Sequence, residues 1–101
     1  MKTPVRPAYE LSEAMCGYVA GIIDGEGHIT QRVLCIYNSS LYLLLKLQLD
    51  IGGHVSTSGG GGGFGLNLRV EERAALLKQI LPYFIIKGNE ASLCLQYSDG
   101  I

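Results

Sequence analysis

Two glycines one helical turn apart lie inside an apolar, helix-like segment near the start of the chain. Gly17 and Gly21 belong to the run Gly-Tyr-Val-Ala-Gly-Ile-Ile. Each glycine in a helix interior costs about 1 kcal/mol relative to alanine. A second backbone packed very close to the glycines offsets that cost. The segment therefore predicts a helix whose glycine-lined face packs tightly against another helix.

The same helix is expected to end in two acids. Asp24 and Glu26 stand beside Gly25 and Gly27, and we expect these glycines to adopt the left-handed conformation of a helix C-cap. Carbonyl groups at a helix C-terminus carry partial negative charge. Together with a carboxylate they offer the oxygen ligands that hard divalent cations prefer. We therefore expect this helix end to be a point where carboxylates gather.

Length and composition agree with one small α+β domain. The 101 residues can bury a modest core, and 48% of them are hydrophobic. Pro4 and Pro7 discourage helix, so we expect residues 1–10 to form an N-terminal arm and residues 11–101 to form a single domain.

The compartment is expected to be intracellular. The apolar runs fall far short of the roughly 20 residues that a bilayer span requires, and no apolar signal core follows Lys2 and Arg6, so we expect neither membrane contact nor secretion. The three cysteines show no spacing typical of a zinc site, so we expect reduced, buried thiols at Cys16, Cys35 and Cys94.

The hydrophobic pattern predicts alternating helices and strands. Ser12 is the expected N-cap of the first helix, which runs to about Asp24. The expected elements after it are a hairpin between His28 and Tyr37, strands His54–Ser58 and Phe64–Val70, a helix over 71–81 stopped by Pro82, an extended segment 83–86, and a last helix from an Asn89 cap to about Tyr97. Residues 41–51 fit both a strand and a wide helical stripe, although the Asn38-Ser39-Ser40 cap cluster and the Gly52-Gly53 stop favour helix.

Five consecutive glycines, Gly59–Gly63, separate the two later strands. Such a run has high chain entropy and carries no side chains that could contact bases. It is compatible with a natural flexible loop, an engineered linker or a shortened recognition hairpin.

Two segments resemble the LAGLIDADG homing endonuclease family. Val19-Ala20-Gly21-Ile22-Ile23-Asp24-Gly25-Glu26-Gly27 is similar to the family's nine-residue signature, with both acids in register. Residues 76–87, Leu-Leu-Lys-Gln-Ile-Leu-Pro-Tyr-Phe-Ile-Ile-Lys, resemble the helix, proline and Ile-Ile-Lys segment that closes the family's fold. The resemblance implies an αββαββα-type fold, with a small antiparallel sheet and helices on one face, and it makes residues 41–51 a helix.

A single acidic signature predicts a homodimer. One carboxylate cannot build a two-metal phosphodiesterase site, in which the metals lie roughly 4 Å apart. Two-fold pairing of the glycine-lined helices would bring two copies of Glu26 together. The residues expected in this interface are Gly17, Ala20, Gly21, Ile23 and Asp24.

The resemblance implies a Mg²⁺ or Mn²⁺ centre in each dimer. Glu26 is the expected metal ligand, and the Gly25 carbonyl is a second oxygen. Asp24 is expected to organise the helix end or to hold a water. Lys87 matches the family's basic residue near the scissile phosphate and is expected to stabilise transition-state charge.

The implied partner is double-stranded DNA with a palindromic or nearly palindromic site. The DNA-contacting candidates are His28, Thr30, Arg32, Asn67 and Arg69. The net charge of −1 predicts modest affinity and a shallow salt dependence. Two functions stay open: a homodimeric, metal-dependent, site-specific endonuclease, and an inactive or minimised scaffold that binds nucleic acid or assists RNA splicing.

Overall fold

The helices and strands alternate in the expected order. The computed structural model describes residues 10–57 and 62–100, so residues 1–9 of the predicted arm and most of the glycine run lie outside it. The elements are α1 (Glu13–Glu26), β1 (Gly27–Ile29), β2 (Leu34–Asn38), α2 (Leu41–Ile51), β3 (His54–Thr57), β4 (Phe64–Asn67), α3 (Val70–Ile80), a short 3-10 helix η1 (Leu81–Tyr83) and α4 (Gly88–Asp99). The predicted α+β class is confirmed, and residues 41–51 are a helix.

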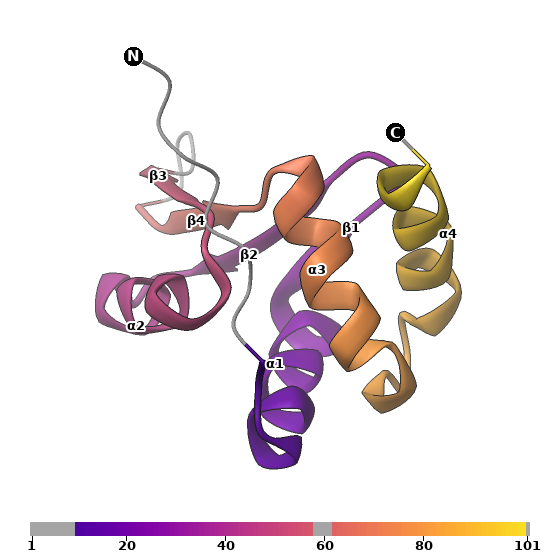
Figure 1. Cartoon of the computed structure of the whole chain (residues 1–101). Helices are drawn as coiled ribbons and strands as arrows, with labels where there is room; N and C mark the ends of the chain where they lie inside the picture. Colours follow the sequence, from indigo (N-terminus) through magenta and orange to yellow (C-terminus); the bar gives the residue numbers. More distant parts are fainter. Residues whose placement is uncertain (1–9, 58–61, 101) are drawn as a thin grey trace.

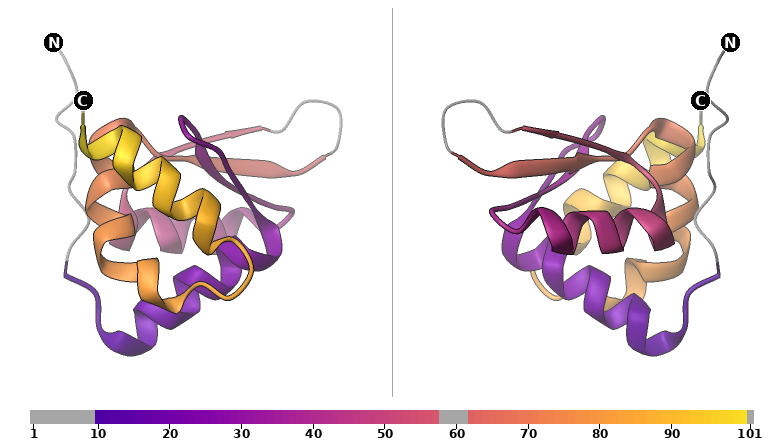
Figure 2. Two further views of the ribbon diagram at one scale, coloured as in Figure 1. Left: turned by 90° about the vertical axis from the view of Figure 1, so that its right-hand side faces the viewer. Right: turned by 90° about the vertical axis from the view of Figure 1, so that its left-hand side faces the viewer.

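The four strands form one antiparallel sheet in the order β1-β2-β4-β3. The two central strands are therefore β2 and β4, which come from different hairpins. The helices gather on one side of the sheet, with α1 between α2 and the η1–α4 connection (Figure 1). The β3–β4 hairpin projects beyond the helices (Figure 2). One face of the sheet is thus covered and the other is open.

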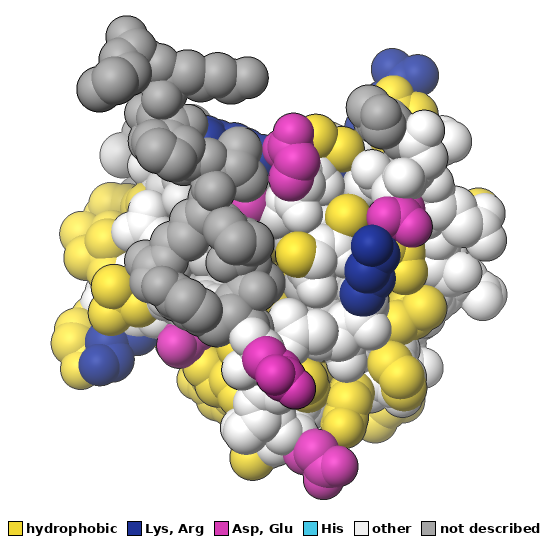
Figure 3. All heavy atoms as spheres, in the orientation of Figure 1, with side chains coloured by type: hydrophobic (Ala, Val, Ile, Leu, Met, Phe, Trp, Pro, Cys, Tyr) yellow, Lys and Arg dark blue, Asp and Glu magenta, His cyan; other side chains and the backbone are white. Residues whose placement is uncertain are grey.

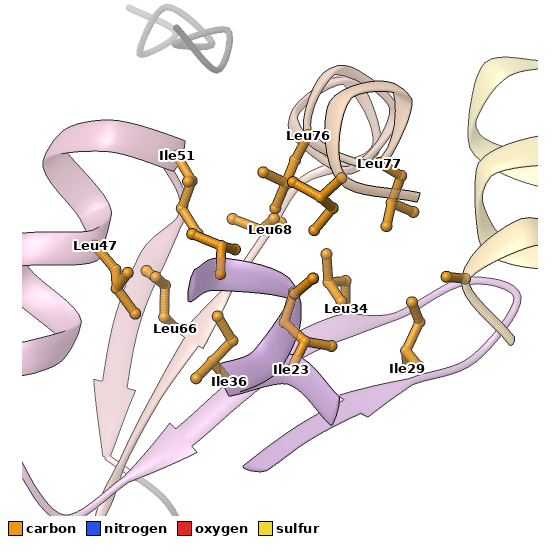
Figure 4. Packing of buried hydrophobic residues seen from close by; sticks show 14 of the residues in the cluster. Ile23, Ile29, Leu34, Ile36, Leu47, Ile51, Leu66, Leu68, Leu76 and Leu77 are labelled. Atoms are coloured by element: carbon orange, nitrogen blue, oxygen red, sulfur yellow. The ribbon is translucent and has the colours of Figure 1, made fainter. Parts of the chain in front are cut away.

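The core lies between the sheet and the helices. Alternate strand residues point inward, and the side chains of Leu34, Ile36 and Leu66 are almost completely buried. They meet Ile23 from α1 and Leu77 from α3, together with the other residues drawn in Figure 4. Cys16, Cys35 and Cys94 are buried free thiols, as expected. Among the described residues, no helix is long and apolar enough to cross a membrane.

The helix starts follow local hydrogen bonds. Ser12 caps α1 by accepting from Met15 N at 3.1 Å, and Ser40 caps α2 by accepting from Leu43 N at 3.2 Å, both within the predicted cap positions. The cap predicted at Asn89 is wrong, because α4 already begins at Gly88 with Lys87 as its N-cap residue.

Strand β4 is shorter than predicted, because a buried carboxylate starts α3 early. The Glu72 side chain is only 3% exposed and accepts hydrogen bonds from Arg69 N at 2.8 Å and from Gly53 N at 2.9 Å. The bond from Arg69 satisfies the N-cap amide of α3 and fixes the turn there, and the bond from Gly53 ties this helix start to the turn between α2 and β3. Val70 therefore belongs to α3 and Arg69 is its N-cap, so neither is a strand residue.

The glycines around Glu26 do not form the predicted left-handed cap. Helix α1 continues through Gly25 to Glu26, and Gly27 has an extended backbone with φ −86°. Glycine is needed at position 27 for space, because an added Cβ would lie 2.7 Å from the Ile23 carbonyl oxygen. The extended residue lets the chain pass directly from α1 into β1.

Candidate metal and nucleic-acid site

The end of α1 is tied to the segment that precedes α4. The Asp24 carboxylate accepts hydrogen bonds from three consecutive backbone amides, Ile85 N at 2.8 Å, Ile86 N at 3.2 Å and Lys87 N at 2.9 Å. Asp24 therefore organises the helix end. Its carboxylate oxygens are occupied by backbone donors.

The Lys87 side chain also contacts the C-terminal end of α1. Its Nζ donates to the Asp24 carbonyl at 2.8 Å and to the Ile23 carbonyl at 3.0 Å. A cation at a helix C-terminus is stabilised by the partial negative charge of the terminal carbonyls. The structure thus brings Lys87 and Asp24 together at the tip of α1.

The hydrogen bonds to Asp24 lower the pKa of its carboxyl group. Burial by itself raises the pKa of this carboxyl group, but the hydrogen bonds from Ile85, Lys87 and Ile86, with the nearby Lys87 charge, outweigh it. The pKa of Asp24 therefore lies below its ordinary value of 3.8. Asp24 stays ionised at neutral pH.

Glu26 is the last residue of α1 and its side chain is exposed. Asn38, at the end of β2, donates a hydrogen bond from Nδ2 to Glu26 Oε2, and its Oδ1 accepts from Ser40 N at 2.8 Å. Asn38 therefore links Glu26 to the start of α2. Sequence reasoning placed Asn38 only among cap residues. Asn38 ends the strand that pairs with the strand directly after Glu26. This hairpin pairing is the sequence signal that could have placed Asn38 beside Glu26.

The donor set at this tip fits half of a magnesium centre. Glu26 offers carboxylate oxygens, and Gly25 beside it is exposed, with no described atom outside the local helix backbone within 4 Å of where a Cβ would lie. Oxygen ligands of this kind are those that Mg²⁺ selects. In the part of the chain that the structure describes, no three His, Cys, Asp or Glu side chains come together. One protomer therefore supplies a partial ligand set.

Two of the residues expected in the dimer interface are not exposed. Gly17 and Gly21 are exposed, whereas the side chains of Ala20 and Ile23 are 0% exposed and belong to the protomer's own core. A helix cannot present these buried residues to a partner as well, because they point toward the sheet. The exposed face instead carries Gly17, Gly21 and Gly25 at four-residue intervals, a set that we call the glycine stripe.

The two sides of the glycine stripe differ in shape. On the α2 side lies an open hollow of about 470 Å³, lined by Tyr18, Gly21, Ile22, Gly25, Glu26 and Leu43. On the other side, Ile85 and Ile86 protrude with 91% and 72% of their surface exposed. Hydrophobic side chains cover α2 and the lower right edge of the molecule (Figure 3). Sequence reasoning matched Ile85 and Ile86 to the family but gave them no role.

Two of the DNA-contacting candidates stand on the open face of the sheet. His28 on β1 pairs with Cys35 on β2, which pairs with Asn67 on β4. His28 and Asn67 are both exposed. The structure thus places both in one row that crosses the sheet.

The other three candidates lie off the strands. Thr30 and Arg32 belong to the β1–β2 turn, where Thr30 Oγ1 accepts from Arg32 N at 3.3 Å. The Arg32 guanidinium lies 5.1 Å from the centre of the Tyr97 ring on α4, a cation–π contact that turns it toward the helices. Arg69 is exposed at the start of α3, just past the end of β4.

Comparison with solved structures identifies the fold. The chain superposes on the homing endonuclease I-CvuI in complex with an I-CreI target, in the presence of Mg and with the DNA not cleaved, with TM-score 0.76, 21% identity, 86% coverage of this chain and 67% of that one. A second I-CvuI structure, in complex with its own target in the presence of Ca, gives TM-score 0.75 and 22% identity over 85% of this chain and 66% of that one. The chain has the LAGLIDADG homing endonuclease fold.

The likeness rests on three-dimensional structure. No protein-family model matches the sequence, and no curated protein matches it. The chain spans about two thirds of the length of the I-CvuI chains. The shared part includes the layout of helices over a four-stranded antiparallel sheet.

We predict that Asp24→Asn lowers the free energy of unfolding by about 1–2 kcal/mol at pH 7, because the amide has one acceptor oxygen for three donors. The depressed pKa of Asp24 gives stability that is present above the ordinary value of 3.8 and is lost as the pH falls through the folded-state value. The difference from the parent should therefore shrink below pH 4. Urea denaturation at pH 7 and pH 3 measures it, with the exposed Glu10→Gln as control. An equal difference in the free energy of unfolding at both pH values would contradict a stabilising role for the ionised Asp24 carboxylate.

Proposed function

We propose that this chain is one subunit of a homodimeric, divalent-metal-dependent endonuclease that cleaves duplex DNA at a nearly palindromic site. The observation that carries the proposal is the exposed Glu26 at the tip of an α1 helix whose free face is a stripe of three glycines. The fold neighbours support it, because they are homing endonucleases held on DNA targets.

Self-complementary shape supports the homodimer. A two-fold axis through the glycine stripe would turn the protruding Ile85 and Ile86 of one protomer toward the hollow on the partner's α1–α2 side. Isologous interfaces are built in this way, with each patch meeting its counterpart. The absence of side chains on Gly17 and Gly21 would let the two α1 backbones approach closely. Their tips, with both copies of Glu26, would then meet.

The chain's own residues have distinct parts in the proposed site. Glu26 and the Gly25 carbonyl would hold a metal, and Asn38 would orient the Glu26 carboxylate. A bound Mg²⁺ or Mn²⁺ supplies charge stabilisation for the attacking and leaving oxygens of phosphodiester hydrolysis. Lys87 places a positive charge beside the site, and Asp24 keeps that lysine's backbone in position.

A second candidate function follows from the distribution of charge. The chain has a net charge of −1, and Arg32 packs on Tyr97 while Lys87 Nζ is used by α1 carbonyls. These features favour a scaffold that has kept the fold and binds nucleic acid or assists RNA splicing without cutting. Nicking of duplex DNA separates the two functions.

We predict that Glu26→Gln abolishes Mg²⁺-dependent nicking of a duplex-target library, because the amide loses the charge that binds the metal. Gel analysis of supercoiled and linear products measures the loss. Glu13→Gln removes an exposed acid from the opposite end of the same helix and should keep full activity. Nicking by Glu26→Gln at the parent rate would overturn the metal assignment. Binding of targets by the parent without any nicking would support the scaffold.

We predict that Asn38→Ala reduces nicking about 10- to 100-fold and raises the Mg²⁺ concentration needed for half-maximal rate, because groups that orient a metal ligand have effects of this size. A Mg²⁺ titration of the initial rate measures both. Asn89→Ala, which removes an exposed amide in the first turn of α4, serves as control. A lower rate with no change in the Mg²⁺ dependence would contradict the orienting role.

We predict that Gly21→Ala weakens self-association at least tenfold while raising the protomer's own stability by about 0.5–1 kcal/mol. Outside the local helix backbone, no described atom lies within 4 Å of the added Cβ, so a partner is what the methyl group would disturb. Sedimentation equilibrium measures association and urea denaturation measures stability. Gln96→Ala, on the exposed side of α4, is the matched control. Unchanged association would exclude the glycine stripe as the interface.

A further inference from the structure

The open face of the sheet has a defined set of side chains. The strand register places seven residues on it: His28, Cys35, Tyr37, His54, Ser56, Gly65 and Asn67. None of these seven is lysine or arginine, the side chains that most often contact guanine through its O6 and N7. Arg69 lies beyond the end of β4, at the N-cap of α3, and so is not part of this set.

An aromatic ring covers the centre of this face. Tyr37 is 46% exposed, and its ring lies across Gly65 on the neighbouring strand, where an added Cβ would come within 3.3 Å of two ring carbons. Cys35, which lies on the same face two residues before Tyr37, is only 1% exposed. The ring therefore packs over Gly65 and leaves part of its apolar surface exposed on this face.

Asn67 is exposed on the same face as Tyr37, and its side-chain amide uses only part of its hydrogen-bonding capacity. It pairs with Cys35 on one side and with His54 on the other, in the middle of the sheet. Its Nδ2 donates one hydrogen to Ser56 Oγ at 3.5 Å. A side-chain amide has two N–H donors and one carbonyl, so one donor and the Oδ1 acceptor stay available on an exposed residue.

We propose that the centre of this face reads an A·T base pair in each half-site, with Asn67 contacting adenine and the Tyr37 ring contacting the thymine methyl group. One amide donor with one acceptor is the set that pairs with N7 and N6 of adenine in the major groove, and apolar groups contact the C5-methyl of thymine. The assignment rests on the proposed function, since it names the duplex that the same protein would select.

The test is selection from a randomised duplex library by the full chain, with Ca²⁺ in place of Mg²⁺, followed by binding measurements on the selected duplex. We expect an A·T preference at one position that recurs symmetrically in both half-sites. Replacing that pair with G·C should weaken binding by the parent about 5- to 150-fold. Asn67→Ala should reduce this difference to within twofold while leaving preferences at other positions intact.

Two variants complete the test. Asn67→Asp keeps the shape of the side chain but removes its donor, so it should lose the same preference, and Asn89→Ala on α4 should lose nothing. A G·C preference, or an A·T preference that survives both Asn67 variants, would overturn the inference while leaving the nuclease proposal intact. Failure of the parent to bind any duplex would overturn both.

Discussion

The structure depends on the exchange of hydrogen bonds between the C-terminal end of α1 and the segment that enters α4. Asp24 accepts three backbone amides from that segment, and Lys87 donates its side chain to two α1 carbonyls. Charge-assisted bonds of this kind are about twice as strong as neutral ones. Because α1 leads directly into β1, these hydrogen bonds also fix the position at which the sheet begins. Glu26 is then held from the other side by Asn38, so the carboxylate lies between two fixed elements.

The inward and outward faces of α1 differ in burial and in side-chain size. On its inward face Ala20 and Ile23 are completely buried, and its outward face carries the glycine stripe, which has no side chains. Glycine in a helix is destabilising for a protomer alone. Among the described residues, nothing outside the local helix contacts the space next to Gly21 or Gly25. In the proposed homodimer, a second α1 packed on the stripe would compensate for the cost of these glycines.

Local sequence patterns predicted much of the fold, and the resemblance to LAGLIDADG homing endonucleases decided that residues 41–51 form a helix. Cap residues such as Ser12 and Ser40 act within one helical turn, and the order of helices and strands follows from them and from the hydrophobic period. What local patterns could not predict are features set by contacts between distant residues. The end of β4 is determined by Glu72, which reaches back to Gly53, and Arg32 is drawn to Tyr97 on the last helix. At the candidate site, Asp24 and Lys87 were identified from sequence, whereas the role of Asn38 needed the pairing of β1 with β2.

Helix α4 has no side-chain cap of its own, since its N-cap residue is Lys87. The amides at the entry to the helix, in Lys87 and the two residues before it, are bound by Asp24, about 60 positions earlier in the chain. Closing a chain loop of that length carries an entropic cost that has to be met before the bonds form. The segment that enters α4 is therefore held in place only when α1 is packed against it, which links the position of the last helix in the sequence to that of the first.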